Sequence, residues 1–179
     1  METAQEQEGS LRRLTAGEIE LARWVFMSTV PYHRVWIHCD SYLPFNLQDD
    51  HTAMTPNGEI YFRFPLYRDD FSKSLPDMQH LFIHEMVHIW QREKGMNVIL
   101  RGLVSWYVSY RYRLDGRLLS EYPMEQQAQI IADNFTLKRE GYRGWCNLIR
   151  SHDVTLDGGI SESAIRRQYR HVLREFPWH

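Results

Sequence analysis

Short segments in which apolar and polar residues alternate occupy the first part of the chain. Residues 35–38 and 59–64 have this period of two, and the second segment follows the turn signal of residues 55–58. Both are therefore predicted strands. Met54 lies across that turn and can supply the other arm of a hairpin. The pattern predicts a small, mostly antiparallel sheet within residues 33–64.

Helical spacing dominates the rest of the chain. Thr15 and Glu18 have the pattern of a capping box, which predicts a helix that continues to about Met27. Later helices are expected at residues 97–104, at residues 123–139 with Gly141 closing, and at residues 162–175 with Ser161 as the cap. Because the strand-like segments all precede the long helices, the predicted fold class is α+β.

The stretch from residue 76 to residue 95 is a further predicted helix. Pro76 and Asp77 suit its first turn, and Arg92 and Lys94 suit its last turn. Between these ends, apolar residues occupy almost every side. A helix that is apolar all round is buried, so we expect this helix in the core.

This helix carries the motif His84-Glu85-Met86-Val87-His88. Side chains four positions apart lie on one helix face, so both imidazoles can reach one tetrahedral ion. Glu85 lies beside them and can take a proton from a metal-bound water without binding the metal. With 9 His in the chain, random placement would give this motif in roughly 3 chains in 100.

The alternative interpretation is a buried helix whose two histidines have ordinary hydrogen-bond partners. Three ionisable groups on one buried helix cost free energy unless each has a partner or a purpose. We therefore predict Zn²⁺ bound by His84 and His88, with Glu85 as the catalytic base.

A catalytic zinc site needs a third protein ligand. The extended motif with a third His is absent, because Lys94 stands at that position. The best candidate is Glu125, in the first turn of the helix at 123–139, where the small Ala128 would allow a close helix approach. Glu125 could instead be an exposed side chain that stabilises its own helix N-terminus. The rival ligands are Glu121, His80 and Asp133.

Composition narrows the class of protein further. The chain has 179 residues, of which 43% are hydrophobic and 25% charged, as in an ordinary globular domain. We expect a single domain at residues 14–179, preceded by a flexible arm at residues 1–13. The net charge of −2 gives no reason to expect nucleic-acid binding. No apolar run approaches the ~20 residues of a membrane span, and the polar N-terminus lacks the apolar segment of a signal peptide.

Several segments resemble the Vgr-related zincin family: LTAGEIELARWVF, VWIHCD, TAMTPNGEIYF, LFIHEMVHIWQ and the EQQA helix that contains Glu125. They occur in the same order across roughly residues 14–140. The family includes short stand-alone proteins and the metallopeptidase domain attached to some type VI secretion spike proteins. It is more distantly similar to the metallopeptidase-like domains of extracellular contractile injection systems.

The resemblance implies a zincin-like metallopeptidase fold. In that fold the small sheet packs on the buried H-E-x-x-H helix and on a second helix that carries a Glu. The resemblance also implies zinc ligation by His84, His88 and Glu125. It further implies a bacterial protein, by default cytoplasmic, that a secretion system exports without a signal peptide.

We expect a zinc-dependent, gluzincin-like metallopeptidase that hydrolyses peptide bonds in a protein or peptide substrate. As a secretion-system effector it would have a spike protein or a cognate immunity protein as partner. Two alternatives stay open, namely an amidase or endopeptidase acting on peptidoglycan crosslinks and a non-catalytic, zincin-fold accessory protein of a secretion apparatus. Candidate donors to the oxyanion are Tyr107, Tyr110, Tyr112 and Tyr122.

Overall fold

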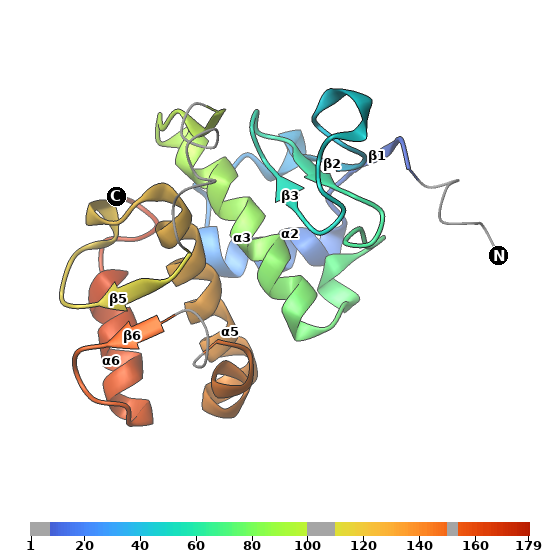
Figure 1. Ribbon diagram of the computed structural model, residues 1–179. Helices are drawn as coiled ribbons and strands as arrows, with labels where there is room; N and C mark the ends of the chain where they lie inside the picture. Colours follow the sequence, from blue (N-terminus) through green and yellow to red (C-terminus); the bar gives the residue numbers. More distant parts are fainter. Residues whose placement is uncertain (1–7, 100–109, 150–153) are drawn as a thin grey trace. The chain divides into compact units, whose positions relative to one another are not determined.

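The chain falls into two compact units, which meet in the sequence between Ile99 and Leu100 (Figure 1). A computed structural model describes residues 8–99, 110–149 and 154–179. We call the part before Leu100 the first unit and the remainder the second unit. The single domain expected for residues 14–179 stays a prediction. Among the described residues, no helix has the length and apolar character needed to cross a membrane.

The first unit contains a sheet of four strands in the order β1-β2-β4-β3. The strands are β1 (Ser10–Arg13), β2 (Trp36–Cys39), β3 (Ala53–Met54) and β4 (Ile60–Phe62). The pairs β1–β2 and β3–β4 are antiparallel, whereas β2–β4 is parallel. The predicted small sheet is present, but within residues 33–64 only β3–β4 is antiparallel, and β1 from outside this range supplies the second antiparallel pair. The predicted hairpin, in which Met54 lies opposite Tyr61, is confirmed.

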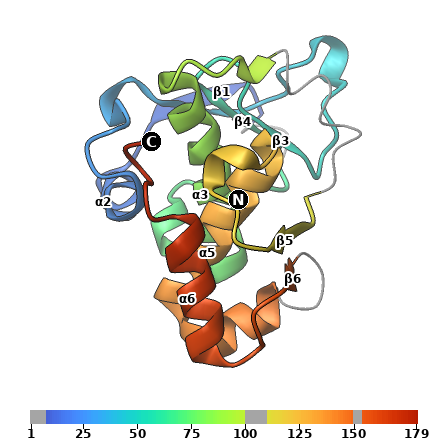
Figure 2. The same ribbon diagram turned by 90° about the vertical axis from the view of Figure 1, so that its left-hand side faces the viewer.

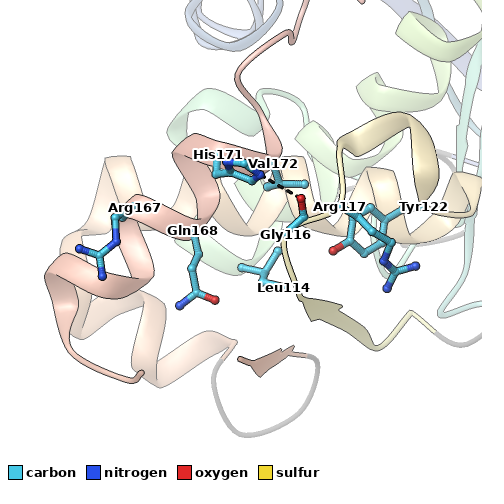
Figure 3. Close-up of a pocket in the computed structure, with 8 residues that line it drawn as sticks. All are labelled: Leu114, Gly116, Arg117, Tyr122, Arg167, Gln168, His171 and Val172. Carbon is cyan, nitrogen blue, oxygen red and sulfur yellow. Dashed lines mark hydrogen bonds between the residues drawn. The ribbon is translucent and has the colours of Figure 1, made fainter. Parts of the chain in front are cut away.

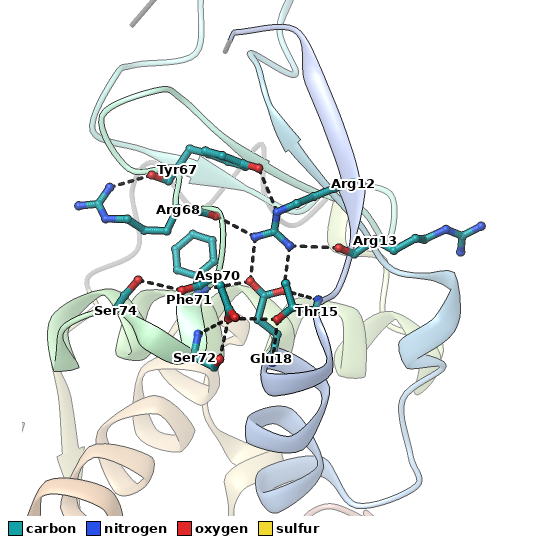
Figure 4. Close-up of polar contacts among 10 residues, drawn as sticks. All are labelled: Arg12, Arg13, Thr15, Glu18, Tyr67, Arg68, Asp70, Phe71, Ser72 and Ser74. Atoms are coloured by element: carbon teal, nitrogen blue, oxygen red, sulfur yellow. Dashed lines mark hydrogen bonds and ion pairs between the residues drawn. The ribbon is translucent and has the colours of Figure 1, made fainter. Parts of the chain in front are cut away.

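The first strand corrects the prediction of a flexible arm that extends to residue 13. Ser10 pairs with Cys39 and Arg13 with Trp36, so residues 10–13 form an edge of the sheet. The segment contains two arginines and therefore looks like an exposed arm, but the charge of Arg12 is paired with the carboxylate of Glu18. Arg12 donates from both terminal nitrogens to Glu18, at 2.9 and 2.8 Å (Figure 4).

Glu18 organises the start of α2 (Ala16–Phe26). Its carboxylate is fully buried and also accepts hydrogen bonds from the backbone N–H groups of Thr15 and Phe71, both at 2.9 Å (Figure 4). The Thr15 hydroxyl in turn accepts from the Glu18 N–H, which confirms the predicted capping box. This cluster therefore ties β1, α2 and the segment before the next helix to one another.

That next helix, α3 (Pro76–Glu93), carries the H-E-x-x-H motif and agrees with the prediction to within a residue at each end. It packs beside α2 in the core of the first unit (Figure 1). Phe71 lies between the sheet and this helix, with ring centroids 4.6 Å from Phe62 and 5.5 Å from Phe82. The sheet thus packs towards the motif helix through aromatic side chains, as predicted.

The described residues of the second unit include two α-helices and a two-stranded sheet, which are labelled in Figure 2. Its elements are β5 (Tyr112–Leu114), α5 (Met124–Leu148), β6 (Val154–Leu156) and α6 (Glu162–Val172). Strands β5 and β6 are parallel, which corrects the expectation that all strands precede His84. Ser161 caps α6 as predicted, its side chain accepting from the Ala164 N–H at 3.2 Å.

Helix α5 is longer than the sequence predicted. Gly141 does not end it but interrupts it with a φ of 75°, after which the helical path continues to Leu148. A glycine adopts this conformation without the steric cost that a Cβ would impose. The helix predicted at residues 97–104 lies largely outside the described residues. Short 3-10 turns complete both units: Tyr32–Arg34, Pro44–Asn46, Phe71–Lys73 and Leu119–Glu121.

Candidate metal centre

Helix α3 brings three potential metal-binding side chains together. His84, Glu85 and His88 each offer a ligand atom, and these atoms all lie within 4.8 Å of one another. The two imidazole rings have centroids 5.2 Å apart and stand nearly perpendicular, at 77°. All three residues are buried, with 7%, 5% and 5% of their surface exposed. The helical spacing of the motif thus produces the convergence that the sequence predicted.

His88 has a hydrogen-bond partner one turn further along α3. Its Nδ1 lies 2.8 Å from Oε1 of Gln91, which is completely buried. Because an amide oxygen only accepts, Nδ1 carries the hydrogen and the lone pair lies on Nε2. This contact selects the tautomer and ring orientation that a metal-binding His requires. Gln91 was not predicted as a partner of His88, although an amide three positions after a candidate ligand lies on the same helix face and is a usable signal.

Glu85 has a partner from a different element. The hydroxyl of Thr55, which directly follows β3, donates to Oε2 of Glu85 at 2.5 Å. Thr55 was recognised only as part of a turn signal. Since it lies thirty residues before Glu85 in the chain, no local pattern could have indicated the contact.

The donor atoms fit a zinc ion. Zinc prefers imidazole nitrogen, with carboxylate oxygen as a frequent further ligand, and both kinds of donor are present. Because both imidazoles are buried, an ion held between them would be shielded from most of the solvent. The hydrogen bond from His88 to Gln91 adds the outer support typical of metal-binding histidines.

The predicted third ligand, Glu125, lies in the first turn of α5 in the second unit. Only 8% of its surface is exposed, so the alternative of an exposed side chain at the helix N-terminus is wrong. A carboxylate is seldom buried without a charged or hydrogen-bonding partner. Because Glu125 belongs to the other unit, its binding to the same ion as His84 stays a prediction.

Two rivals for the third ligand have structural partners in the second unit. Glu121 is exposed and accepts from the Leu118 N–H at 2.6 Å. Asp133 is fully buried and accepts from the hydroxyl of Tyr112 at 2.6 Å and from the amide of Gln129 at 3.3 Å. These contacts account for both carboxylates without a metal. The third rival, His80, lies half-buried on α3, one turn before His84.

Asp133 is one end of a buried hydrogen-bond chain. Trp145 donates to the hydroxyl of Tyr169 at 3.1 Å, and the hydroxyls of Tyr169 and Tyr112 lie 2.5 Å apart. Since Tyr112 donates to Asp133, Tyr169 donates to Tyr112. Burial and the Asp133 carboxylate raise the pKa of Tyr112 well above its usual value, so this phenol stays neutral.

The hydrogen bonds of the candidate tyrosines show which of their hydroxyls already have partners in the second unit. The hydroxyl of Tyr112 is engaged by Asp133, and that of Tyr122 donates to the Arg113 carbonyl at 2.5 Å. Both phenols therefore have structural roles. Tyr110 is 49% exposed, and Tyr107 lies outside the described residues. None of the described tyrosines is therefore assigned as the oxyanion donor.

A pocket of about 280 Å³ lies in the second unit (Figure 3). Its lining residues are Leu114, Gly116, Arg117, Tyr122, Arg167, Gln168, His171 and Val172. Arg117 pairs with Asp115 at 2.8 Å and stacks on Tyr122, while His171 bonds the Gly116 carbonyl at 2.9 Å. These partners favour a packing role, and no lining residue belongs to the predicted metal set.

Comparison with known proteins places the chain in a family. No family model matches it. The type VI secretion system spike protein VgrG2b of Pseudomonas aeruginosa is 39% identical over 174 residues, which cover 93% of this chain and 15% of that protein. The solved structure of the effector domain of P. aeruginosa VgrG2b is 33% identical, with a TM-score of 0.66 over 86% of this chain and 87% of that domain. The chain therefore belongs to the family of the VgrG2b effector domain.

Proposed function

We propose that this chain is a zinc-dependent metallopeptidase with a zincin-like fold. One observation carries the proposal, namely the buried group of His84, Glu85 and His88, whose ligand atoms lie within 4.8 Å of one another. The contact between His88 and Gln91 supports it, since a metal-binding His commonly donates its other N–H to a protein acceptor.

In the proposed reaction, His84, His88 and Glu125 hold the ion. Zinc, when bound, supplies Lewis acidity that lowers the pKa of water at the site to about 7 and polarises a peptide carbonyl. Glu85 accepts the proton of the attacking water and later delivers it to the leaving amine. Gln91 keeps the ring of His88 in the orientation that presents Nε2.

We further propose that the enzyme is a type VI secretion effector. Its membership of the VgrG2b effector-domain family supports this role. The matched region is 15% of the VgrG2b spike protein, so association of this chain with a spike protein belongs to the proposal. A cognate immunity protein in the producing cell is the second proposed partner.

Glu85 favours an enzyme over a non-catalytic accessory protein. A structural zinc site is closed by its protein ligands and has no use for a base. Here the buried carboxylate of Glu85 directly follows one proposed ligand, and its oxygen lies within 4.8 Å of the ligand atoms of both imidazoles. Burial of a charge that serves no reaction would cost free energy without benefit.

The test compares zinc-loaded wild type with the Glu85→Ala variant. Each protein is incubated with an unstructured protein and, separately, with peptidoglycan, and products are identified by mass spectrometry. Glu93→Ala is the matched control, because Glu93 is an exposed Glu on the same helix. We expect cleavage by wild type and Glu93→Ala and none by Glu85→Ala, which should retain zinc.

The two substrates separate the possible reactions. Cleavage of the unstructured protein would identify a peptidase, whereas release of crosslink fragments alone would identify a peptidoglycan hydrolase. Equal activity in wild type and the Glu85→Ala variant would refute the proposed base. A zinc-loaded wild type that cleaves neither substrate would support the accessory-protein alternative.

A further inference from the structure

Thr55 and Glu85 form one of the shortest polar contacts in the first unit. The hydroxyl oxygen of Thr55 lies 2.5 Å from Oε2 of Glu85, and each residue is only 5% exposed. Such a distance is typical of a hydroxyl that donates to an ionised carboxylate, a charge-assisted bond stronger than one between neutral groups. The contact therefore restrains the Glu85 side chain.

The sheet determines where the Thr55 hydroxyl lies. Thr55 directly follows β3, whose last residue, Met54, is in register with Tyr61 of β4. Pro56 comes next and is buried, and the residue before a proline is confined to extended backbone conformations. Thr55 is thus held by strand pairing on one side and by a proline on the other.

Helix α3 fixes the position of the Glu85 backbone, but it does not by itself fix the position of the carboxylate. A Glu side chain has three rotatable bonds, so its carboxylate can occupy many positions around the helix. Anchoring Oε2 at Thr55 removes most of this freedom and leaves Oε1 as the oxygen that can accept a proton. Correct orientation of a reacting group before the reaction is a large source of rate enhancement.

We propose that Thr55 is a positioning residue for Glu85, which holds the general base in its reactive orientation. The inference rests on the proposed function, because it assigns Thr55 a task in that reaction. It differs from a purely structural role, in which the hydroxyl would only compensate the buried charge of Glu85. A structural role predicts lower stability, whereas a positioning role predicts a lower turnover number in the folded, zinc-loaded protein.

The kinetic test uses three substitutions. Thr55→Val keeps the shape of the side chain but removes the hydroxyl, and Thr55→Ser keeps the hydroxyl. Thr136→Val is the control, since Thr136 is also a buried threonine, whose hydroxyl bonds its own helix at the Ala132 carbonyl. We expect Thr55→Val to lower kcat by about 10-fold or more with little change in KM or zinc content. Thr55→Ser and Thr136→Val should stay within about twofold of wild type.

A second measurement does not depend on activity. In zinc-free protein labelled with ¹³C at the glutamate carboxyl carbons, the Glu85 signal is identified as the one that Glu85→Gln removes. We expect that signal to move in Thr55→Val and to keep its position in Thr55→Ser and Thr136→Val. If Thr55→Val does not fold, Thr55→Ala removes the hydroxyl without placing a methyl group against the carboxylate.

The outcomes separate this inference from the proposed function. An unchanged kcat in the variants that lack the hydroxyl would overturn the inference, and so would an unmoved Glu85 signal. So would equal loss of kcat in Thr55→Ser and Thr55→Val, because the hydroxyl would then be irrelevant. Absence of hydrolysis in wild type would refute the peptidase. The carboxyl signal would still decide whether Thr55 orients Glu85, an unmoved signal overturning the inference.

Discussion

Nδ1 of His88 lies 2.8 Å from Oε1 of Gln91, so a proposed zinc ligand and the group that orients it belong to the same helix. The two residues are separated by less than one helical turn, which places their side chains on one face. The contact to Gln91 therefore lies within α3 and does not depend on the packing of a second element.

This relationship predicts the effect of removing the Gln91 amide. Gln91→Leu should weaken zinc binding by roughly 10-fold or more, because His88 loses the acceptor that fixes its tautomer. Gln91→Glu should preserve binding, since a carboxylate is an even better acceptor. Competition with a chromophoric chelator measures the affinities.

Gln79→Leu is the matched control for that prediction. Gln79 is another buried amide of α3, and its nitrogen donates to the Ser72 carbonyl at 2.9 Å. We expect this change to reduce stability without altering zinc affinity. Equal losses of affinity in the two Leu variants would mean that the effect comes from the helix as a whole.

The third ligand can be tested with two glutamates close in sequence. Glu125→Ala should reduce zinc affinity by more than about 100-fold, beyond what loss of an outer hydrogen-bond partner causes. Glu121→Ala should leave affinity unchanged, because Glu121 is exposed and accepts from the Leu118 N–H. The affinities are again measured by chelator competition. The reverse ranking of the two variants would identify Glu121 as the ligand.

Asp70 should make the first unit sensitive to acid. Burial alone would raise the pKa of Asp70, but hydrogen bonds from Ser72 and Thr15 outweigh burial and hold this pKa below its usual 3.8 (Figure 4). A lowered folded-state pKa adds stability above pH 3.8, and this contribution is lost as the pH falls through the folded-state value.

The Asp70→Asn variant measures that contribution. Its free energy of unfolding should be lower than that of wild type at pH 7, and the difference should shrink as the pH falls below about 4. Urea unfolding at a series of pH values provides the measurement. Asp69→Asn, at an exposed neighbouring position, controls for the loss of one surface charge. A difference independent of pH would mean that Asp70 stabilises through shape alone.

Removal of zinc should loosen the protein locally. Chelation should abolish activity and speed amide exchange in residues 96–125, because Glu125 would lose the ion that it is proposed to bind. Helix α3 should stay protected, since its burial in the first unit does not require metal. Hydrogen exchange with mass spectrometry measures both. Global unfolding on chelation would instead indicate a structural zinc site.

The sequence by itself determined the features that depend on local spacing. The capping box of Thr15 and Glu18 and the convergence of His84, Glu85 and His88 follow from the spacing within one helical turn, and the extent of α3 follows from the residue types at its two ends. The hairpin around Met54 follows likewise from a turn signal and a short alternating segment. In each case the interacting residues are close in the chain, so a pattern of residue types is sufficient to predict them.

Tertiary structure alone decided which distant residues meet. The polar segment at residues 10–13 is a strand because its backbone pairs with β2, which lies more than twenty residues later in the chain. Strands β5 and β6 are only three residues each, too short for a periodic signal, and pair across α5. Thr55 reaches Glu85 only because a sheet and a helix pack together. Such contacts depend on how elements pack, and no spacing along the sequence encodes that packing locally.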